Sequence, residues 1–408
     1  MAPSIDGRRC APPAIISHNK KIFPKKRYDT NKVILLEFNN FCISHIIYSY
    51  FANILKKKYK ANIIAYDGQI LLTHKININI LKKINIYLGK FFKLKFFGVY
   101  LSFGVKDFYF VDKKKVNKNI LKKNINIFFK KVKSLKDLEN YKIYDILIGD
   151  LLYDTFLKSN YDLKPTIDLK EEKFRLFVEN FIALFLIWYD YFKKNKVKVV
   201  ISSHAVYSLG IPARIGTKFN SDNFVVNAES VFRIKKNFLF QFYEAGFFKK
   251  IFRKLNSSKK KYLLNKGKQK LSDRINGKYT SDYPYITKSP FGKIRNFKKI
   301  NKKNRNIFLI ATHDFVDAPH AMGNSLFPDF YQWFTHLCKF SNITNDLWFV
   351  KTHPNFGGEY KRYIDYERQI VVSISRKFPN MNLLPQNISH QDIVKLGVDA
   401  VFTVNGTI

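Results

Sequence analysis

The 408-residue chain has few cysteines, few acidic residues and no long apolar run. Its three cysteines, Cys10, Cys42 and Cys338, lie far apart in no metal-binding spacing, which argues against a disulfide framework or a zinc site and suits a reducing compartment. The most apolar segment, Phe181 to Tyr189, has nine residues, whereas a membrane-spanning helix needs about 20. The first residues carry charges without a continuous apolar core, so they do not look like a signal peptide.

Acidic residues are outnumbered, with 31 Asp plus Glu against 72 Lys plus Arg and a formal net charge of +41. This charge predicts attraction to polyanions, whether nucleic acid, an anionic membrane face or phosphorylated substrates. The alternative is base composition, because the abundant Lys, Asn, Ile, Phe and Tyr have codons rich in A and T. No RNP-like, KH-like or paired Cys/His pattern accompanies the charge, so no specific nucleic acid partner is predicted.

Apolar runs of strand length alternate with segments of helical spacing, which predicts an α/β fold with Rossmann-like sheets. The chain is long enough for two core-bearing domains. Strands are predicted at 32–38, 61–66, 96–103, 197–201, 224–226, 306–313, 347–354 and 400–404. Helices are predicted at 43–59, 75–90, 113–133, 170–194 and 207–218.

These elements divide the chain into four parts. Residues 1–30 are predicted to be a disordered or loosely packed leader, and residues 31–245 an N-terminal Rossmann-like domain on the acceptor side. The Lys- and Arg-rich segment 246–305 is interpreted as a solvated linker. Residues 306–408 are expected to form a partial nucleotide-sugar-binding Rossmann-like domain, incomplete at the C-terminus because the sequence stops after its third strand.

Candidate donor-binding residues follow the predicted strands of the second domain, where ligands bind in open α/β sheets. Lys351 can neutralise a phosphate and His353 can donate to a phosphate or ribose oxygen, and the alternative is a surface lysine beside a structural turn. Ser389 is an expected helix N-cap, for which simple capping is the stronger interpretation. Asn405, Gly406 and Thr407 are expected to open a helix whose N–H groups hold a phosphate.

The segment from His313 to His320 concentrates titratable side chains. His313, Asp314, Asp317 and His320 could act as base and orienter or could ligate a divalent metal. The Ala-Pro pair within the segment favours a loop. We therefore expect these residues to position donor or acceptor, with Asp317 a candidate catalytic group, and we expect no metal.

The first domain supplies two candidate bases. His204, preceded by Ser203, lies at the end of a predicted strand and has a neutral pKa suited to deprotonating a sugar hydroxyl. Asp67, at the end of the second strand, is the alternative base. A structural role for a lone histidine at a strand end stays open as well.

The chain resembles the capsular and lipopolysaccharide biosynthesis glycosyltransferases of the two-domain GT-B fold. The resemblance is carried by IGDLLYD at 148–154, ISSHAVYSLGIPAR at 201–214, ATHDFVDAPH at 311–320, LFPDFYQW at 326–333, VKTHP at 350–354 and TVNGT at 403–407. It implies that Lys351 and His353 hold the donor's phosphate or ribose and that Asn405, Gly406 and Thr407 begin a second phosphate-binding loop. Relatives continue past this loop with a helix whose acidic residue holds the donor ribose.

The implied activity is transfer of a sugar from a nucleotide-sugar to a lipid-linked or growing surface polysaccharide, in the cytoplasm at the inner face of the cytoplasmic membrane. No cofactor is expected besides the donor substrate, and a peripheral association with the anionic membrane is expected from the charge. Alternatives are a glycerophosphate or polyol-phosphate transferase of the wall-teichoic type, a non-catalytic polyanion-binding protein, and a pseudoenzyme.

Overall fold

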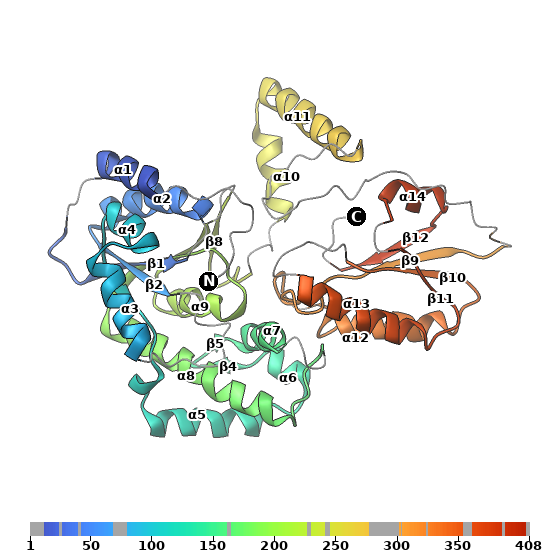
Figure 1. Cartoon of the computed structure of the whole chain (residues 1–408), viewed down its shortest axis with the longest axis horizontal. Helices are drawn as coiled ribbons and strands as arrows, with labels where there is room; N and C mark the ends of the chain where they lie inside the picture. The colour runs from blue at the N-terminus through green and yellow to red at the C-terminus, as the bar shows by residue number, and fades with distance from the viewer. Residues whose placement is uncertain are drawn as a thin grey trace.

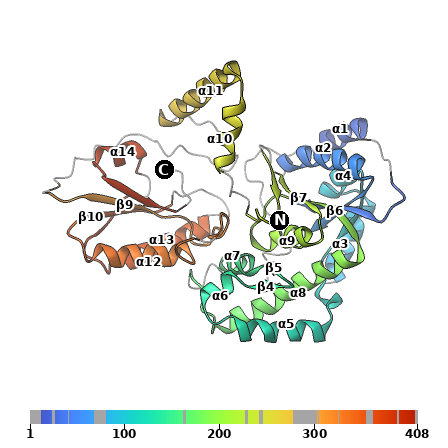
Figure 2. The ribbon, with the colours of Figure 1, turned by 180° about the vertical axis from the view of Figure 1, so that it is seen from behind.

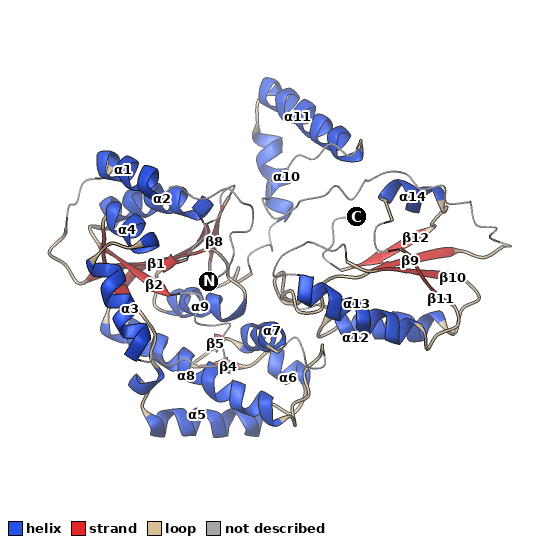
Figure 3. Cartoon of the chain, in the orientation of Figure 1, coloured by secondary structure: helices blue, strands red, loops and turns tan. Residues whose placement is uncertain are grey.

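The computed structural model contains two large sheets, each in its own lobe, with a pair of helices between them in the sequence (Figure 1, Figure 3). We call residues 12–240 the larger lobe and residues 304–404 the smaller lobe. The structure describes residues 12–23, 27–39, 42–67, 80–160, 165–226, 230–240, 245–276, 302, 304–323, 325–353, 361–385 and 388–404.

The larger lobe is built on a six-stranded sheet of order β3-β2-β1-β6-β7-β8, in which only β8 runs antiparallel to its neighbour. Its strands are β1 Lys32–Phe38, β2 Asn62–Asp67, β3 Val105–Tyr109, β6 Lys196–Ser202, β7 Asp222–Val226 and β8 Val231–Ile234. A separate two-stranded hairpin joins β4 Lys142–Ile143 to β5 Ile146–Leu147.

Helices cover both faces of this sheet because its central strands are apolar on both sides. In β1, Val33 and Leu35 face one core, whereas Ile34 and Leu36 face the other, as the two-residue period of a strand requires. The helices of the lobe are α1 Pro12–Ile22, α2 Cys42–Tyr59, α3 Ile80–Phe91, α4 Lys95–Ser102, α5 Lys118–Lys131, α6 Leu135–Glu139, α7 Gly149–Ser159, α8 Glu172–Lys194 and α9 Ile211–Lys218, with 3₁₀ turns η2 Lys113–Lys115 and η3 Tyr207–Gly210.

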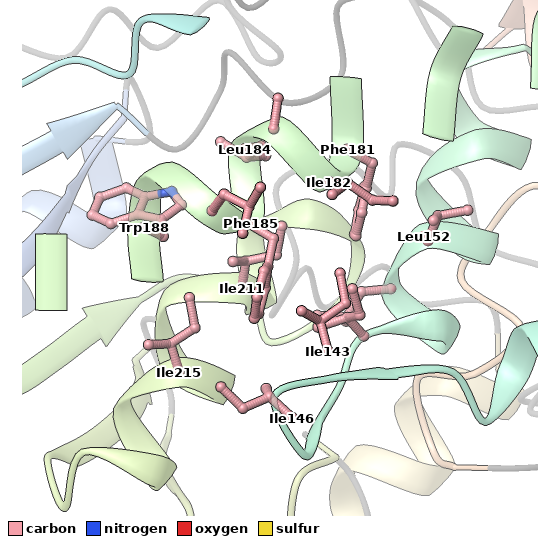
Figure 4. Packing of buried hydrophobic residues seen from close by; sticks show 14 of the residues in the cluster. Ile143, Ile146, Leu152, Phe181, Ile182, Leu184, Phe185, Trp188, Ile211 and Ile215 are labelled. Carbon is pink, nitrogen blue, oxygen red and sulfur yellow. The ribbon is translucent and has the colours of Figure 1, made fainter. Parts of the chain in front are cut away.

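The larger of the two cores is organised by α8 (Figure 4). Phe181, Ile182 and Phe185 project from this helix toward residues of α7, α9 and the small hairpin. Trp188 packs instead against Tyr66 of β2 and Tyr109 of β3, and all four side chains of α8 are buried. Each buried aromatic or branched side chain contributes about 1.5–3 kcal/mol. The apolar run that is too short to cross a membrane is thus the centre of the larger lobe. Among the described residues, no helix is long and apolar enough to span a bilayer.

The smaller lobe has a four-stranded, fully parallel sheet of order β11-β10-β9-β12. Helices α12 and α13 lie on one face and α14 lies on the other (Figure 1). The elements are β9 Ile307–Ala311, α12 Phe330–Ser341, β10 Leu347–Lys351, α13 Lys361–Ser375, β11 Met381–Leu383, α14 His390–Lys395 and β12 Ala400–Thr403.

Two expectations about local structure were wrong, and the solvated linker has helices that were not predicted. Segment 96–103 is the helix α4 rather than a strand, because its buried residues Val99, Tyr100 and Phe103 follow a helical spacing that a short apolar run conceals. Part of the leader is helix α1, which packs on α4 through Ile15 and Ile16 and is joined to it by Asn19, whose side-chain amide donates to Ser102 Oγ at 3.0 Å. The basic linker contains two helices, α10 Ala245–Lys254 and α11 Ser257–Ile275.

Candidate functional site at the lobe junction

Both sheets reverse their strand order beside their first strand. In the larger lobe the reversal lies between β1 and β6, and in the smaller lobe it lies between β9 and β12. Open α/β sheets bind ligands outside the carboxyl ends of the strands at such a switch point. The residues that follow these four strands are therefore the first place to look for a site.

At the switch point of the larger lobe, three polar side chains are linked in series by hydrogen bonds. Ser203 Oγ donates to Glu37 Oε1 at 2.9 Å, and His204 Nδ1 lies 2.9 Å from Ser203 Oγ. The backbone N–H of Ser203 donates to the second oxygen of Glu37. Since the hydroxyl proton points to the carboxylate, the free lone pair of Oγ accepts from Nδ1–H. This assigns the proton of neutral His204 to Nδ1 and leaves Nε2 able to accept a proton.

Exposure along this chain follows the same order. Glu37 is 1% exposed and Ser203 5%, whereas His204 is exposed to solvent. Asn39 also contacts the buried end, donating to Glu37 Oε1 at 3.3 Å. Glu37 was missed by sequence analysis, although an acid at the end of the apolar run KVILLEF is a signal for it.

The smaller lobe places two histidines at the ends of adjacent strands. The rings of His313, after β9, and His353, after β10, have centroids 5.8 Å apart, and both side chains are half-buried. Lys158, from the end of α7 in the larger lobe, acts electrostatically on Asp314 and Asp317. We call the group formed by Lys158, Tyr207, His313, Asp314, Asp317 and His353 the junction cluster.

The two carboxylates of the junction cluster differ in their acidity. Burial raises the pKa of Asp314, with Asp317 adding to the rise and Lys158 opposing it. Burial also acts to raise the pKa of Asp317, but Lys158, His313, the Tyr207 hydroxyl and His353 outweigh it and leave that pKa below its usual value. Although the surrounding groups partly desolvate the Asp317 carboxylate, its side chain still reaches solvent, so a substrate can contact this ionised group.

Tyr207 brings the two switch points together. It lies three residues after His204, and its hydroxyl donates to Asp317 Oδ1 at 3.0 Å. Val206, Tyr207 and Ala318 form a small buried apolar contact at the same place. The carboxyl ends of β6 and β9 therefore lead into the same junction, one from each lobe.

A second set of polar contacts between the lobes is buried. His320 Nδ1 lies 2.6 Å from Asp154 Oδ1, and its Nε2 lies 3.6 Å from Glu139 Oε1. Behind Asp154, the guanidinium of Arg214 pairs with Asp150 at 2.6 Å. Burial lowers the pKa of His320, but Asp154 and Glu139 outweigh burial and raise it to about 10. His320 is thus a charged partner of Asp154 at neutral pH.

Asp329 makes the third buried link. The Tyr153 hydroxyl and the Thr166 hydroxyl each donate to Asp329 Oδ2 at 2.6 Å, and the backbone N–H of Gln332 donates to Oδ1 at 2.8 Å. Asp329 therefore caps α12 and holds the larger lobe at the same time. We call His320–Asp154 and the Asp329 contacts the interlobe bonds.

Several predicted site residues have structural positions instead. His320 is buried in an interlobe bond and cannot contact an acceptor. Lys351 is 8% exposed and lies near Glu367, whose carboxylate accepts from Thr312 Oγ1 at 2.6 Å. Burial lowers the pKa of Lys351 and raises that of Glu367 to about 8. Because Lys351 is buried and interacts electrostatically with Glu367, a phosphate contact is not assigned to it.

The remaining candidates fall into two groups. Ser389 is buried and forms a capping box with Asp392, which matches the capping interpretation rather than donor binding. Asp67 ends β2, away from the switch point, and is 9% exposed. The predicted phosphate loop, Asn405, Gly406 and Thr407, lies outside the described residues. In the part of the chain that is described, no three His, Cys, Asp or Glu side chains are grouped to hold a metal ion.

No protein-family model, curated protein or solved structure matches this chain.

Proposed function

We propose that the protein is a glycosyltransferase of the GT-B type that transfers a sugar from a nucleotide donor held by the smaller lobe to an acceptor held by the larger lobe. The observation that carries the proposal is the Tyr207–Asp317 hydrogen bond at 3.0 Å, because it joins segments that follow the switch points of two Rossmann-like sheets. Polar groups from both lobes can then act on one substrate pair.

In this proposal His204 is the general base. Its Nε2, left unprotonated by the bond from Nδ1 to Ser203, would take the proton of the acceptor hydroxyl as the new glycosidic bond forms. Glu37 and Ser203 would orient the imidazole through their hydrogen bonds. General-base catalysis of this kind contributes about 10²- to 10⁴-fold to a rate.

The donor nucleotide would lie at the ends of β9 and β10. His313 and His353 can donate to phosphate or ribose oxygens, and Lys158 supplies a positive charge from the opposite lobe. Asp317 would accept from a sugar hydroxyl, since a carboxylate is unsuited to phosphate contact. Neutralising the leaving nucleotide is the larger electrostatic task in such a transfer.

The test is a thermal-shift screen of the whole chain against CMP, CDP, UDP, GDP, their sugars and CDP-glycerol. A ligand that binds the native state raises the melting temperature by mass action. We expect a saturable shift with one nucleotide, lost in His353→Ala and kept in His336→Ala, a matched histidine on the exposed side of α12. A shift with CDP-glycerol alone would favour polyol-phosphate transfer, and a shift unchanged in His353→Ala would refute this donor site.

A further inference from the structure

The helices α10 and α11 stand apart from both lobes. Figures 1 and 2, seen from opposite sides, show α11 clear of the two sheets and of their covering helices. Every residue from 261 to 272 is exposed to solvent. Helices shorter than about 12–15 residues are marginal in water without packing against a partner. The ten-residue α10 is therefore expected to need a surface to pack on in order to be stable.

The sequence of α10 separates apolar from basic side chains. Phe248, Ile251, Phe252 and Leu255 have the i, i+3, i+4, i+7 spacing of a single helix face, which continues one residue beyond the helix end. The opposite face carries Lys249, Lys250, Arg253 and Lys254. Phe248 is 61% exposed and Ile251 42%, whereas Phe252 and Leu255 are half-buried, so the part of the apolar face formed by Phe248 and Ile251 is open to solvent.

The next helix adds charge and further exposed apolar side chains. Between residues 245 and 275 there are eleven Lys and Arg against a single acid, Asp273. Tyr262, Leu264 and Leu271 on α11 are 63%, 52% and 60% exposed. The helical pair thus offers dense positive charge together with large apolar side chains in water.

We propose that α10 and α11 dock on the surface of an anionic lipid bilayer. A helix with Lys and Arg on one face and Phe, Ile and Leu on the other lies in the plane of the headgroups, with its apolar face in the acyl boundary and its cations at lipid phosphates. A nucleic acid would satisfy the charge but would leave Phe248 and Ile251 in water. A second copy of this pair would bring two strongly positive surfaces together. The inference does not depend on the proposed activity.

The experiment is sedimentation of the whole chain with sucrose-loaded vesicles of phosphatidylcholine, with or without about 30% phosphatidylglycerol, at low and high salt. Binding is expected only with the anionic vesicles and should weaken as salt screens the charges. Phe248→Trp gives a second readout, because the native tryptophans Trp188, Trp333 and Trp348 are buried. Its emission should shift to the blue when the vesicles are added.

Two variants separate charge from apolar contact, each with a matched control. Phe248→Ser with Ile251→Ser is compared with Ile120→Ser and Leu176→Ser, which are exposed apolar residues of the larger lobe. Lys249→Gln, Lys250→Gln and Lys254→Gln are compared with the same change at the exposed lysines 118, 122 and 123 of α5. Circular dichroism melts confirm that all four variants fold.

We expect both α10 variants to lose at least about tenfold in vesicle partitioning and the controls to stay within about twofold, since each surface cation contributes measurably to binding. Equal losses in the α5 lysine control would mean diffuse electrostatic attraction and would overturn the proposal. Binding to RNA that survives Phe248→Ser with Ile251→Ser, without vesicle binding, would overturn it as well, as would dimerisation through α10 in place of vesicle binding.

Discussion

The loop between β9 and α12 contains two histidines seven residues apart with opposite environments. His320 is 3% exposed and held by Asp154, whereas His313 is half-buried, faces His353 and stays accessible. The residue type and the loop are the same, so only burial and partners distinguish them. A histidine at a position expected to be in the site is thus a structural residue when it forms a buried ion pair with a carboxylate from a distant part of the chain.

Removing the buried pair of His320 and Asp154 should lower the free energy of unfolding more than any other change considered below. Asp154→Ala leaves the His320 cation buried without its partner, and removal of one member of a buried pair costs about 3–5 kcal/mol. Urea unfolding measures the loss. Asp190→Ala, which removes an exposed pair with Lys194 on α8, should cost no more than about 0.5 kcal/mol. Similar losses in the two variants would contradict the structural role of His320.

The same pair should make stability depend on pH. The pKa of His320 is raised from 6.5 to about 10, so its stabilisation is complete below pH 6.5 and is lost as pH rises through about 10. Burial raises the pKa of Asp154 from 3.8 to about 6, so the free energy of unfolding also falls as pH rises between these two values. The double variant Asp154→Asn with His320→Gln should lack this decline, whereas the background from Glu367 is common to both proteins. If the free energy of unfolding depended on pH in the same way in the native protein and in the double variant, the pair would not be the cause of the decline.

The Asp329 contacts should contribute somewhat less. Asp329→Ala removes the N-cap of α12 and leaves the Tyr153 and Thr166 hydroxyls without their acceptor, for a cost of about 2–3 kcal/mol. Ser134→Ala removes only a solvent-exposed cap, at the start of helix α6, and should cost about 1 kcal/mol. Chemical denaturation of both variants distinguishes an interlobe contact from simple capping, for which the two costs would be equal.

The hydrogen bonds that link Glu37, Ser203 and His204 should affect the tautomer of His204 more than the free energy of unfolding. Ser203→Ala removes the acceptor of His204 Nδ1–H at a cost of about 1–2 kcal/mol. Nitrogen-15 NMR of labelled histidine should show the Nδ1–H tautomer for native His204 and a shift toward Nε2–H in the variant. The Ser203→Thr variant retains the hydroxyl and should retain the tautomer. A native Nε2–H tautomer would rule out His204 as the base.

The accessible histidines, His313 and His353, should contribute little to the free energy of unfolding. His313→Ala with His353→Ala removes two half-buried rings that form no hydrogen-bonded ion pair like that of His320 with Asp154, and we expect a change within about 0.5 kcal/mol. Differential scanning fluorimetry without ligand measures it. A loss as large as that of Asp154→Ala would make both histidines structural and would remove the distinction between them.

Sequence analysis was strongest where one short-range pattern decides the structure. The strands at 32–38 and 197–201 and the helix at 170–194 were predicted within one or two residues, because apolar period and length specify an element locally. It failed for segment 96–103, where a short apolar run fits a strand and a buried helix equally well. It also missed α10 and α11, because the density of basic residues concealed the helical spacing of their apolar ones.

The α/β alternation, the positive charge and the polar residues that end the strands can be read from the amino-acid sequence, since each depends on neighbours along the chain. Which of those polar residues are accessible depends on how distant segments pack together. His320, Asp150 and Asp154 belong to segments on which the glycosyltransferase prediction was based, yet they are buried among themselves and Arg214. Their partners are 64 and 166 residues away in the chain, and a charged side chain's role depends on the distant groups that exclude water from it.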